Sequence, residues 1–155
     1  MKEILLTKGY IAFVDDDDYE KLNRFSWHVA VRPHTNYAGS GSGRQRNYKL
    51  MHNLVLATPA GMMVDHIDRN GLNNQKSNLR LSTRSQNFYN SVKRKGNRSG
   101  FKGVLQRPSG QFYAAIGYKG KKLFLGNYPT AQEAAVAYNK KAVELAGAFA
   151  RLNEV

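Results

Sequence analysis

Residues 62–87 of this sequence bring together side chains that could do chemistry. Residues 62–67 are apolar except for Asp65 and His66, which come near the end of the run. An imidazole titrates near neutral pH and can take a proton from water, and carboxylate and amide side chains supply hard oxygen donors. These residue types favour hydrolytic chemistry, although a single His beside an Asp is more often a structural pair.

The sequence around these residues predicts a ββα unit. A polar loop rich in Asn and Gly follows the first strand, and Asn-Leu-Arg-Leu supplies a second one. Thr83 and Gln86 have the spacing of a capping box, so a helix should follow Thr83 with Asn87 in its first turn. Neighbouring strand residues point to opposite faces, so Asp65 and His66 can share one site only if the strand ends or twists there. The turn-prone loop directly after them supplies such an end.

A resemblance to a known family rests on four stretches, residues 51–54, 64–67, 78–80 and 86–87. They resemble the HNH endonuclease family, in the subgroup whose third motif residue is Asn. The resemblance implies that His66 is the general base and that Asp65 and Asn87 ligate one divalent metal ion. It also implies that Asn78 fixes the loop and the His66 ring. His52 matches a recurrent family position, and its role is left open.

The reaction that this resemblance implies is hydrolysis of a phosphodiester bond. Hydrolysis needs a deprotonated water, neutralisation of the charge on the phosphate and help for the leaving 3′ oxygen. A metal held by one carboxylate and one amide keeps most of its coordination sphere for water and phosphate, so it can act as a Lewis acid. Two hard oxygen ligands without a thiolate favour Mg²⁺, with Mn²⁺ possible, over Zn²⁺.

Charge indicates a polyanionic partner. The 155 residues include 24 Lys or Arg and 11 Asp or Glu, which gives a net charge of +13. Residues 69–132 hold 13 Lys or Arg and no acid, interleaved with aromatic residues. Such a segment is typical of a surface that faces the phosphates of double-stranded DNA, and a solubilising face is the alternative. Arg80 and Arg84 could clamp the scissile phosphate or lie on a solvated face.

The sequence after residue 100 predicts three strands and a helix. Turns separate the β-like runs within residues 101–128, and Thr130 precedes a helix with an apolar stripe. The stretch resembles the ethylene-response-factor-type (APETALA) DNA-binding domain over nearly all of residues 99–153, on motifs such as Gly-Phe-Lys-Gly-Val at 100–104. That resemblance implies a sheet that enters the major groove. DNA contacts are expected from Lys102, Arg107, Lys122 and Phe124, of which the basic three could also be simple surface charges.

We therefore expect an α+β protein with two functional parts. An HNH domain should span residues 1–92, with its ββα-metal core at about 62–92, and a sheet-plus-helix DNA-binding domain should span 100–155. A basic linker at 93–99, with Lys93, Arg94 and Lys95, should lie along the DNA backbone. Such pairings are typical of phage and intron-borne homing endonucleases, so we predict a metal-dependent, site-specific enzyme that acts on DNA as a monomer or homodimer. A catalytically inactive DNA-binding or regulatory protein is the alternative.

The lack of cysteine and the lack of a long apolar run exclude further classes of protein. The sequence has no cysteine, which excludes a disulfide scaffold, a thiolate nucleophile and a Cys-ligated zinc site. It has no run of 18 apolar residues, so we expect no membrane partner and a place in the cytoplasm of a bacterial or phage-infected cell.

Residues 15–18, four Asp in a row, should cap a short helix, because they lack the DxDxDG pattern of a calcium loop.

Overall fold

A computed structural model describes residues 1–41, 47–93 and 95–155 of the chain. The predicted DNA contact Arg94 lies outside the described residues. The chain divides into an N-terminal unit, Met1–Thr83, and a C-terminal unit, Arg84–Val155. The sequence instead predicts a catalytic domain that extends to residue 92 and a linker at 93–99, and this division into domains stays a prediction. Helices and antiparallel sheets occur together, which confirms the predicted α+β class.

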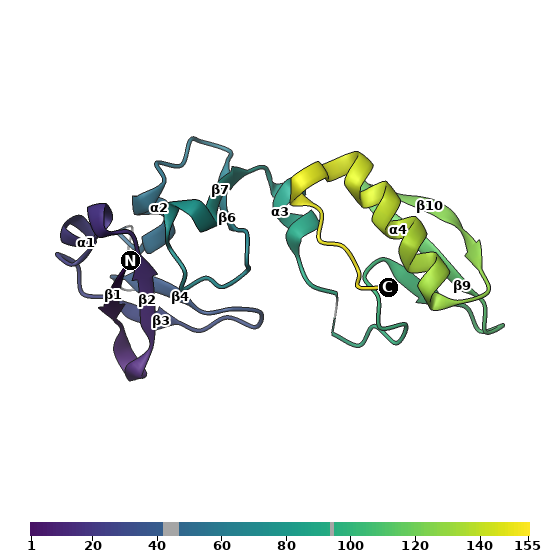
Figure 1. The fold of residues 1–155 in the computed structure, drawn as a ribbon, viewed down its shortest axis with the longest axis horizontal. Coiled ribbons are helices and arrows are strands. Elements are labelled where there is room, and N and C mark those ends of the chain that lie inside the picture. Colours follow the sequence, from purple (N-terminus) through teal and green to yellow (C-terminus); the bar gives the residue numbers. More distant parts are fainter. Residues whose placement is uncertain (42–46, 94) are drawn as a thin grey trace. The chain divides into compact units, whose positions relative to one another are not determined.

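The described residues of the N-terminal unit form short antiparallel strands and two short helices (Figure 1). Its strands are β1 (Lys2–Leu5), β2 (Ile11–Val14), β3 (His28–Ala30), β4 (Tyr37–Ser40), β5 (Lys49–Leu50), β6 (Met63–His66) and β7 (Leu79–Ser82). Its helices are α1 (Asp16–Leu22) and α2 (Met51–Val55), with 3-10 turns at Thr7–Gly9 and Lys76–Asn78. β1 pairs with β2, β6 pairs with β7, and β4 lies between β3 and β5. Leu22, Trp27 and Met51 are among the buried residues that form the core.

Asp15 fastens the loop between β6 and β7 to the N-terminal hairpin. Its carboxylate accepts hydrogen bonds from the Gln75 side chain at 3.3 Å and from the Lys76 backbone N–H at 2.7 Å. The predicted helix is present as α1, but the predicted capping role is wrong for Asp15, whose side chain makes no capping hydrogen bond. Asp18 forms an ion pair with Lys76 at 2.8 Å. The acidic run therefore anchors the loop that carries the candidate site.

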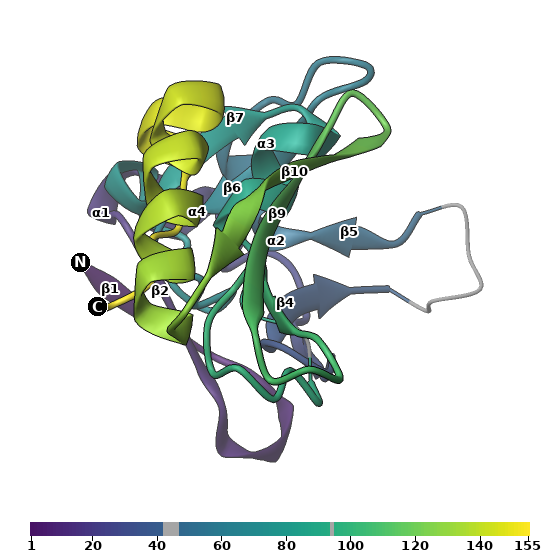
Figure 2. The same cartoon turned by 90° about the vertical axis from the view of Figure 1, so that its right-hand side faces the viewer.

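The C-terminal unit is a three-stranded antiparallel sheet packed on one long helix, as predicted. Its elements are α3 (Arg84–Asn90), β8 (Val104–Gln106), β9 (Phe112–Tyr118), β10 (Lys121–Tyr128), α4 (Ala131–Ala146) and a 3-10 turn at Gly147–Phe149. The Thr130 hydroxyl caps α4 by accepting a hydrogen bond from the Glu133 N–H. Helix α4 runs along β9 and β10 (Figure 2), and a Cβ atom at Gly103 would collide with the Tyr138 ring of α4. Small residues thus let helix and sheet approach closely.

Within the described parts of the chain, no helix is both long enough and apolar enough to cross a membrane.

Candidate active site

The pairing of β6 with β7 determines the surroundings of Asp65. The register sets Asp65 opposite Arg80 and His66 opposite Leu79. Arg80 donates from Nε to Asp65 Oδ2 at 2.8 Å, and its Nη2 lies 2.8 Å from the same oxygen. Asp65 is only 4% exposed, so its charge is compensated by a cation on the neighbouring strand. The structure therefore gives Arg80 a partner inside the protein, where the sequence suggested a phosphate clamp or a solvated face.

His66 lies in a cluster of three rings, of which its own and that of His52 are buried. Its ring centroid is 5.0 Å from that of His52 on α2 and 5.7 Å from that of Tyr37 on β4. Burial lowers the pKa of the His66 imidazole, while a hydrogen bond with the Asn74 side chain and the nearby Asp68 and Asp65 carboxylates act in the opposite direction. The lowered pKa keeps His66 neutral at pH 7, which is the form that can accept a proton.

His52, whose role the sequence left open, packs edge-on against His66. The two ring planes meet at 85°, and Tyr37 also contacts His52 with its ring centroid at 5.5 Å. Burial, followed by the neighbouring His66, lowers the pKa of His52 from 6.5 to about 3. His52 is therefore neutral in the folded protein and serves as a wall for the His66 ring.

This lowered pKa predicts that acid destabilises the protein through His52. Below pH 6.5 the unfolded chain binds a proton at His52, whereas the folded protein does not until about pH 3. The free energy of unfolding should fall as the pH falls through this range, by up to about 1.4 kcal/mol per pH unit from this residue. His52→Phe should make the free energy of unfolding depend less on pH. Urea unfolding followed by circular dichroism at several pH values measures this dependence. The exposed His34→Phe is the control, and an unchanged slope for His52→Phe would contradict the prediction.

Asn78 holds the loop between β6 and β7. Its side-chain nitrogen donates to Asp68 Oδ1 at 2.9 Å and to the Asn73 carbonyl at 2.9 Å, and its oxygen accepts from the Asp68 N–H at 3.0 Å. The hydrogen bond that acts on the His66 ring involves Asn74 instead. Sequence reasoning missed Asn74, although Asn in a polar loop commonly bonds to nearby backbone, as Asn74 does to Leu72. The roles of Asn78 and His66 in catalysis stay predictions.

Asn87, the third motif residue, lies in helix α3 of the C-terminal unit. Within residues 1–41, 47–93 and 95–155 there is no group of three or more His, Asp or Glu that could hold a metal ion. The chemistry of a carboxylate and an amide still fits Mg²⁺, which keeps several waters and commonly takes only one or two protein ligands.

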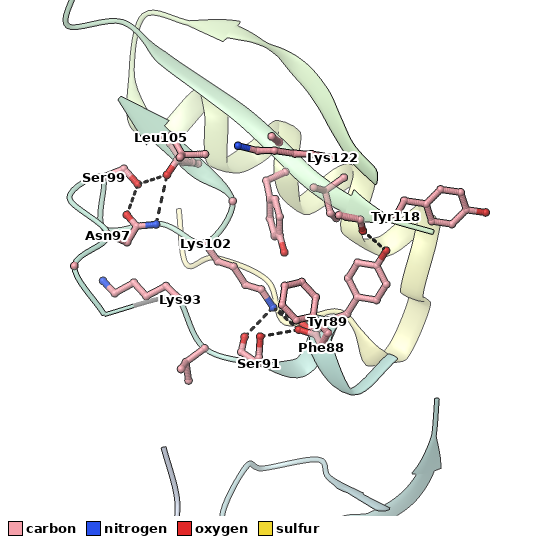
Figure 3. A pocket seen from close by; sticks show the side chains of 18 of the residues that line it. Phe88, Tyr89, Ser91, Lys93, Asn97, Ser99, Lys102, Leu105, Tyr118 and Lys122 are labelled. Carbon is pink, nitrogen blue, oxygen red and sulfur yellow. Dashed lines mark hydrogen bonds between the residues drawn. The ribbon is translucent and has the colours of Figure 1, made fainter. Parts of the chain in front are cut away.

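The C-terminal unit has a wide basic hollow (Figure 3). It measures about 1210 Å³ and is lined by α3, by residues after it and by parts of β8, β9 and β10. Because residues 69–132 contain no acid, the charges on its walls are all positive. The predicted DNA contacts that line it are Arg84, Lys93, Lys95, Lys102, Arg107 and Lys122.

Three of the predicted contacts, two of which also line the hollow, gather around Tyr113 on the sheet. The Arg107 guanidinium carbon lies 5.1 Å from the Tyr113 ring centroid, and the Lys122 ammonium lies 5.4 Å from it. Phe124, which is 57% exposed, has its ring centroid 6.2 Å from that of Tyr113. Exposed cations beside aromatic faces suit phosphates and bases.

Lys102 differs from these exposed cations. It is 9% exposed, and its ammonium donates to the carbonyls of Phe88, Tyr89 and Ser91 at 3.2, 2.6 and 2.8 Å. The expectation of a DNA contact is therefore replaced by an internal role, because the three carbonyls take up its donors.

Comparisons with known proteins agree with the motif. A family model described as HNH endonuclease matches residues 57–89. An uncharacterised HNH endonuclease of Acanthamoeba polyphaga mimivirus is 34% identical over 150 residues, which cover 96% of this chain and 77% of the relative. The chain therefore belongs to the HNH endonuclease family, and it is an endonuclease.

Plant proteins are similar to part of the chain. Dehydration-responsive element-binding protein 2A of Arabidopsis thaliana is 48% identical over 58 residues, 36% of this chain and 17% of that protein. An ethylene-responsive transcription factor of the same plant is 32% identical over 97 residues, 59% of each chain. No solved structure is similar enough to count as a match. The match to both kinds of protein confirms the two resemblances seen in the sequence.

Proposed function

We propose that this endonuclease is a metal-dependent, site-specific enzyme of the homing type that cleaves double-stranded DNA. The observation that carries the proposal is His66, an imidazole kept neutral by burial beside the Asp65 carboxylate at the end of β6. The basic hollow and the Tyr113 cluster of the C-terminal unit support a DNA substrate, since both present cations without acids. The plant relatives, one of which is named an element-binding protein, support recognition of particular sites.

The residues of the N-terminal unit suit the first step of hydrolysis. The neutral His66 takes a proton from water, and the hydroxide attacks the phosphorus. His52 and Tyr37 pack against the ring, and Asn74 holds it by a hydrogen bond, so the ring need not reorganise during the step. The Asp68 carboxylate, fixed by Asn78 and Asn73, favours the imidazolium that forms. Mg²⁺ or Mn²⁺ bound by Asp65 and Asn87 would supply Lewis-acid stabilisation of the leaving 3′ oxygen.

The metal requirement is tested by plasmid cleavage across a titration of Mg²⁺ or Mn²⁺, with EDTA as the blank. Asn87→Ala should raise the metal concentration needed for half-maximal rate by about tenfold or more, while Asn87→Asp should retain activity because it supplies another oxygen ligand. Calorimetric titration with Mn²⁺ should show that the wild-type protein and Asn87→Asp bind the ion more tightly than Asn87→Ala does. Cleavage by the wild-type protein in EDTA would contradict the proposed metal dependence.

The DNA surface predicts a change in salt dependence. Arg107→Ala and Lys122→Ala should each weaken duplex binding and flatten the slope of log K against log[salt] by about 0.9 per lost phosphate contact. If either residue reads a base, the variant should instead relax one position of the site by about 1–3 kcal/mol. Fluorescence anisotropy at several salt concentrations measures the slope and the discrimination between sequences. It compares random duplexes with duplexes that carry the cleavage site, which is identified by sequencing the cleaved ends.

The control is Lys140→Ala, which removes an exposed cation from α4. It should leave affinity and slope close to those of the wild-type protein. Variants of Arg107 and Lys122 that bind like this control would remove the sheet from the proposed DNA surface.

A further inference from the structure

Helix α3 is built into the core of the C-terminal unit, although the family pattern makes it the last element of the catalytic motif. Tyr89 of α3 is buried in the same core as Val104 and Tyr138. Its hydroxyl donates to the Gly117 carbonyl at 2.6 Å, and its own carbonyl accepts from the Arg151 N–H at 3.1 Å. The helix is thus attached at its side to the sheet and at its end to the C-terminal segment.

Lys102 secures the C-terminal end of this helix (Figure 3). The last carbonyls of a helix lack partners within it, and a cation there is favoured by the helix dipole. The three acceptors around the Lys102 ammonium, the carbonyls of Phe88, Tyr89 and Ser91, match its three N–H donors. An ammonium is costly to bury unless such partners are present, so the arrangement holds only while α3 ends at this place.

The backbone of Lys102 is fixed in turn by the remainder of the unit. The Lys102 N–H donates to Asn153 Oδ1 at 2.7 Å, and Asn153 Nδ2 donates to the Lys102 carbonyl at 3.0 Å. Asn153 also exchanges hydrogen bonds with Asn139 of α4, at 2.9 and 2.8 Å. A continuous chain of hydrogen bonds therefore runs from α4 through Lys102 to the end of α3.

We propose that Lys102 is a positioning residue for cleavage: it holds the helix that carries Asn87 on the folded DNA-binding unit. In this role it contacts neither DNA nor the reacting atoms. The proposal rests on the proposed function in one respect, the participation of Asn87 in cleavage. It assigns to Lys102 a role that the resemblance to plant DNA-binding domains does not contain.

The test compares Lys102→Met, which keeps an unbranched apolar side chain and loses the cation, with Lys140→Met on the exposed face of α4. Hydrogen exchange at the amides of residues 86–90 should quicken by about tenfold or more in Lys102→Met only, because hydrogen bonds to a charged group are lost. The single-turnover cleavage rate should fall by a similar factor. Affinity for DNA, measured by anisotropy in EDTA, should stay within about twofold, and Lys102→Arg should recover part of the rate.

Further variants separate this proposal from the role of Asn87. If Lys102 acts through Asn87, the double variant Lys102→Met/Asn87→Ala should cleave no more slowly than Asn87→Ala alone. If Asn87→Ala cleaves at the wild-type rate, Asn87 takes no part in cleavage. The hydrogen-exchange rates of Lys102→Met then still decide whether Lys102 holds α3. Normal exchange with a loss of DNA affinity in Lys102→Met would overturn the proposal and make Lys102 a DNA contact.

A second variant serves if Lys102→Met does not fold. Tyr89→Phe keeps the buried ring and removes only the hydrogen bond to Gly117, so it should quicken exchange in α3 and slow cleavage, with DNA affinity unchanged. Exchange and cleavage at wild-type rates in Tyr89→Phe would then count against an anchored α3 and overturn the proposal.

Discussion

Replacing His66 by Ala should slow single-turnover cleavage by about 10²- to 10⁴-fold, because the variant has no group to take the proton from the attacking water. Affinity for duplex DNA should remain within about twofold, since the imidazole makes no charge-based contact with phosphate in its neutral form. Cleavage kinetics and anisotropy on one preparation measure the two quantities.

Packing around His66 calls for a second variant. The ring contacts His52 and Tyr37, so Ala leaves a cavity in the cluster, whereas His66→Gln fills more of it. Both should lose the rate, and circular dichroism should show that His66→Gln is folded. A His66→Gln enzyme with the full cleavage rate would remove His66 from the mechanism.

Replacing Arg80 by Ala should lower the free energy of unfolding by about 3–5 kcal/mol, because it takes the cation away from a buried carboxylate. Asp65 is 4% exposed and lies 2.8 Å from both Nε and Nη2 of Arg80. Urea unfolding of the variant measures the loss. Arg24→Ala, which removes an exposed cation from the same unit, should cost little.

A double variant separates the ion pair from other effects. Asp65→Leu/Arg80→Met removes both charges together, so it should be more stable than Arg80→Ala alone. If Arg80→Ala unfolds at the same urea concentration as the wild-type protein, Arg80 is a surface cation and returns to the candidates for phosphate contact.

The elements of the motif could be predicted from local patterns, but most partners of its side chains could not. Alternation and turn residues indicated the strands that became β6 and β7, and Thr83 marked the start of α3 at Arg84. The pairing of Arg80 with Asp65 depends on the register across an irregular loop, which hydrophobic alternation alone leaves open. Without that pairing, the sequence offers Arg80 only phosphate or solvent as a partner.

Contacts between distant parts of the chain were the least predictable. The acidic run predicts a cap for α1, yet Asp15 bonds to Gln75 and Lys76, about sixty residues further along, because the loop folds back onto β2. The edge-on packing of His52 against His66 likewise depends on where α2 packs. The resemblance to the plant DNA-binding domain implies a DNA contact at Lys102, and only tertiary packing shows that its side chain turns inward.

The shared core of α3 and the C-terminal sheet matters for making hybrid nucleases. A hybrid joined within residues 93–99 would transplant the sheet without the helix whose end Lys102 holds, and it would leave Tyr89 without its buried surroundings. A junction immediately before Arg84 would move α3, Lys102 and the sheet together. The C-terminal sheet should therefore be exchanged between such enzymes as one block that begins at α3, with the β6–β7 hairpin retained from the recipient.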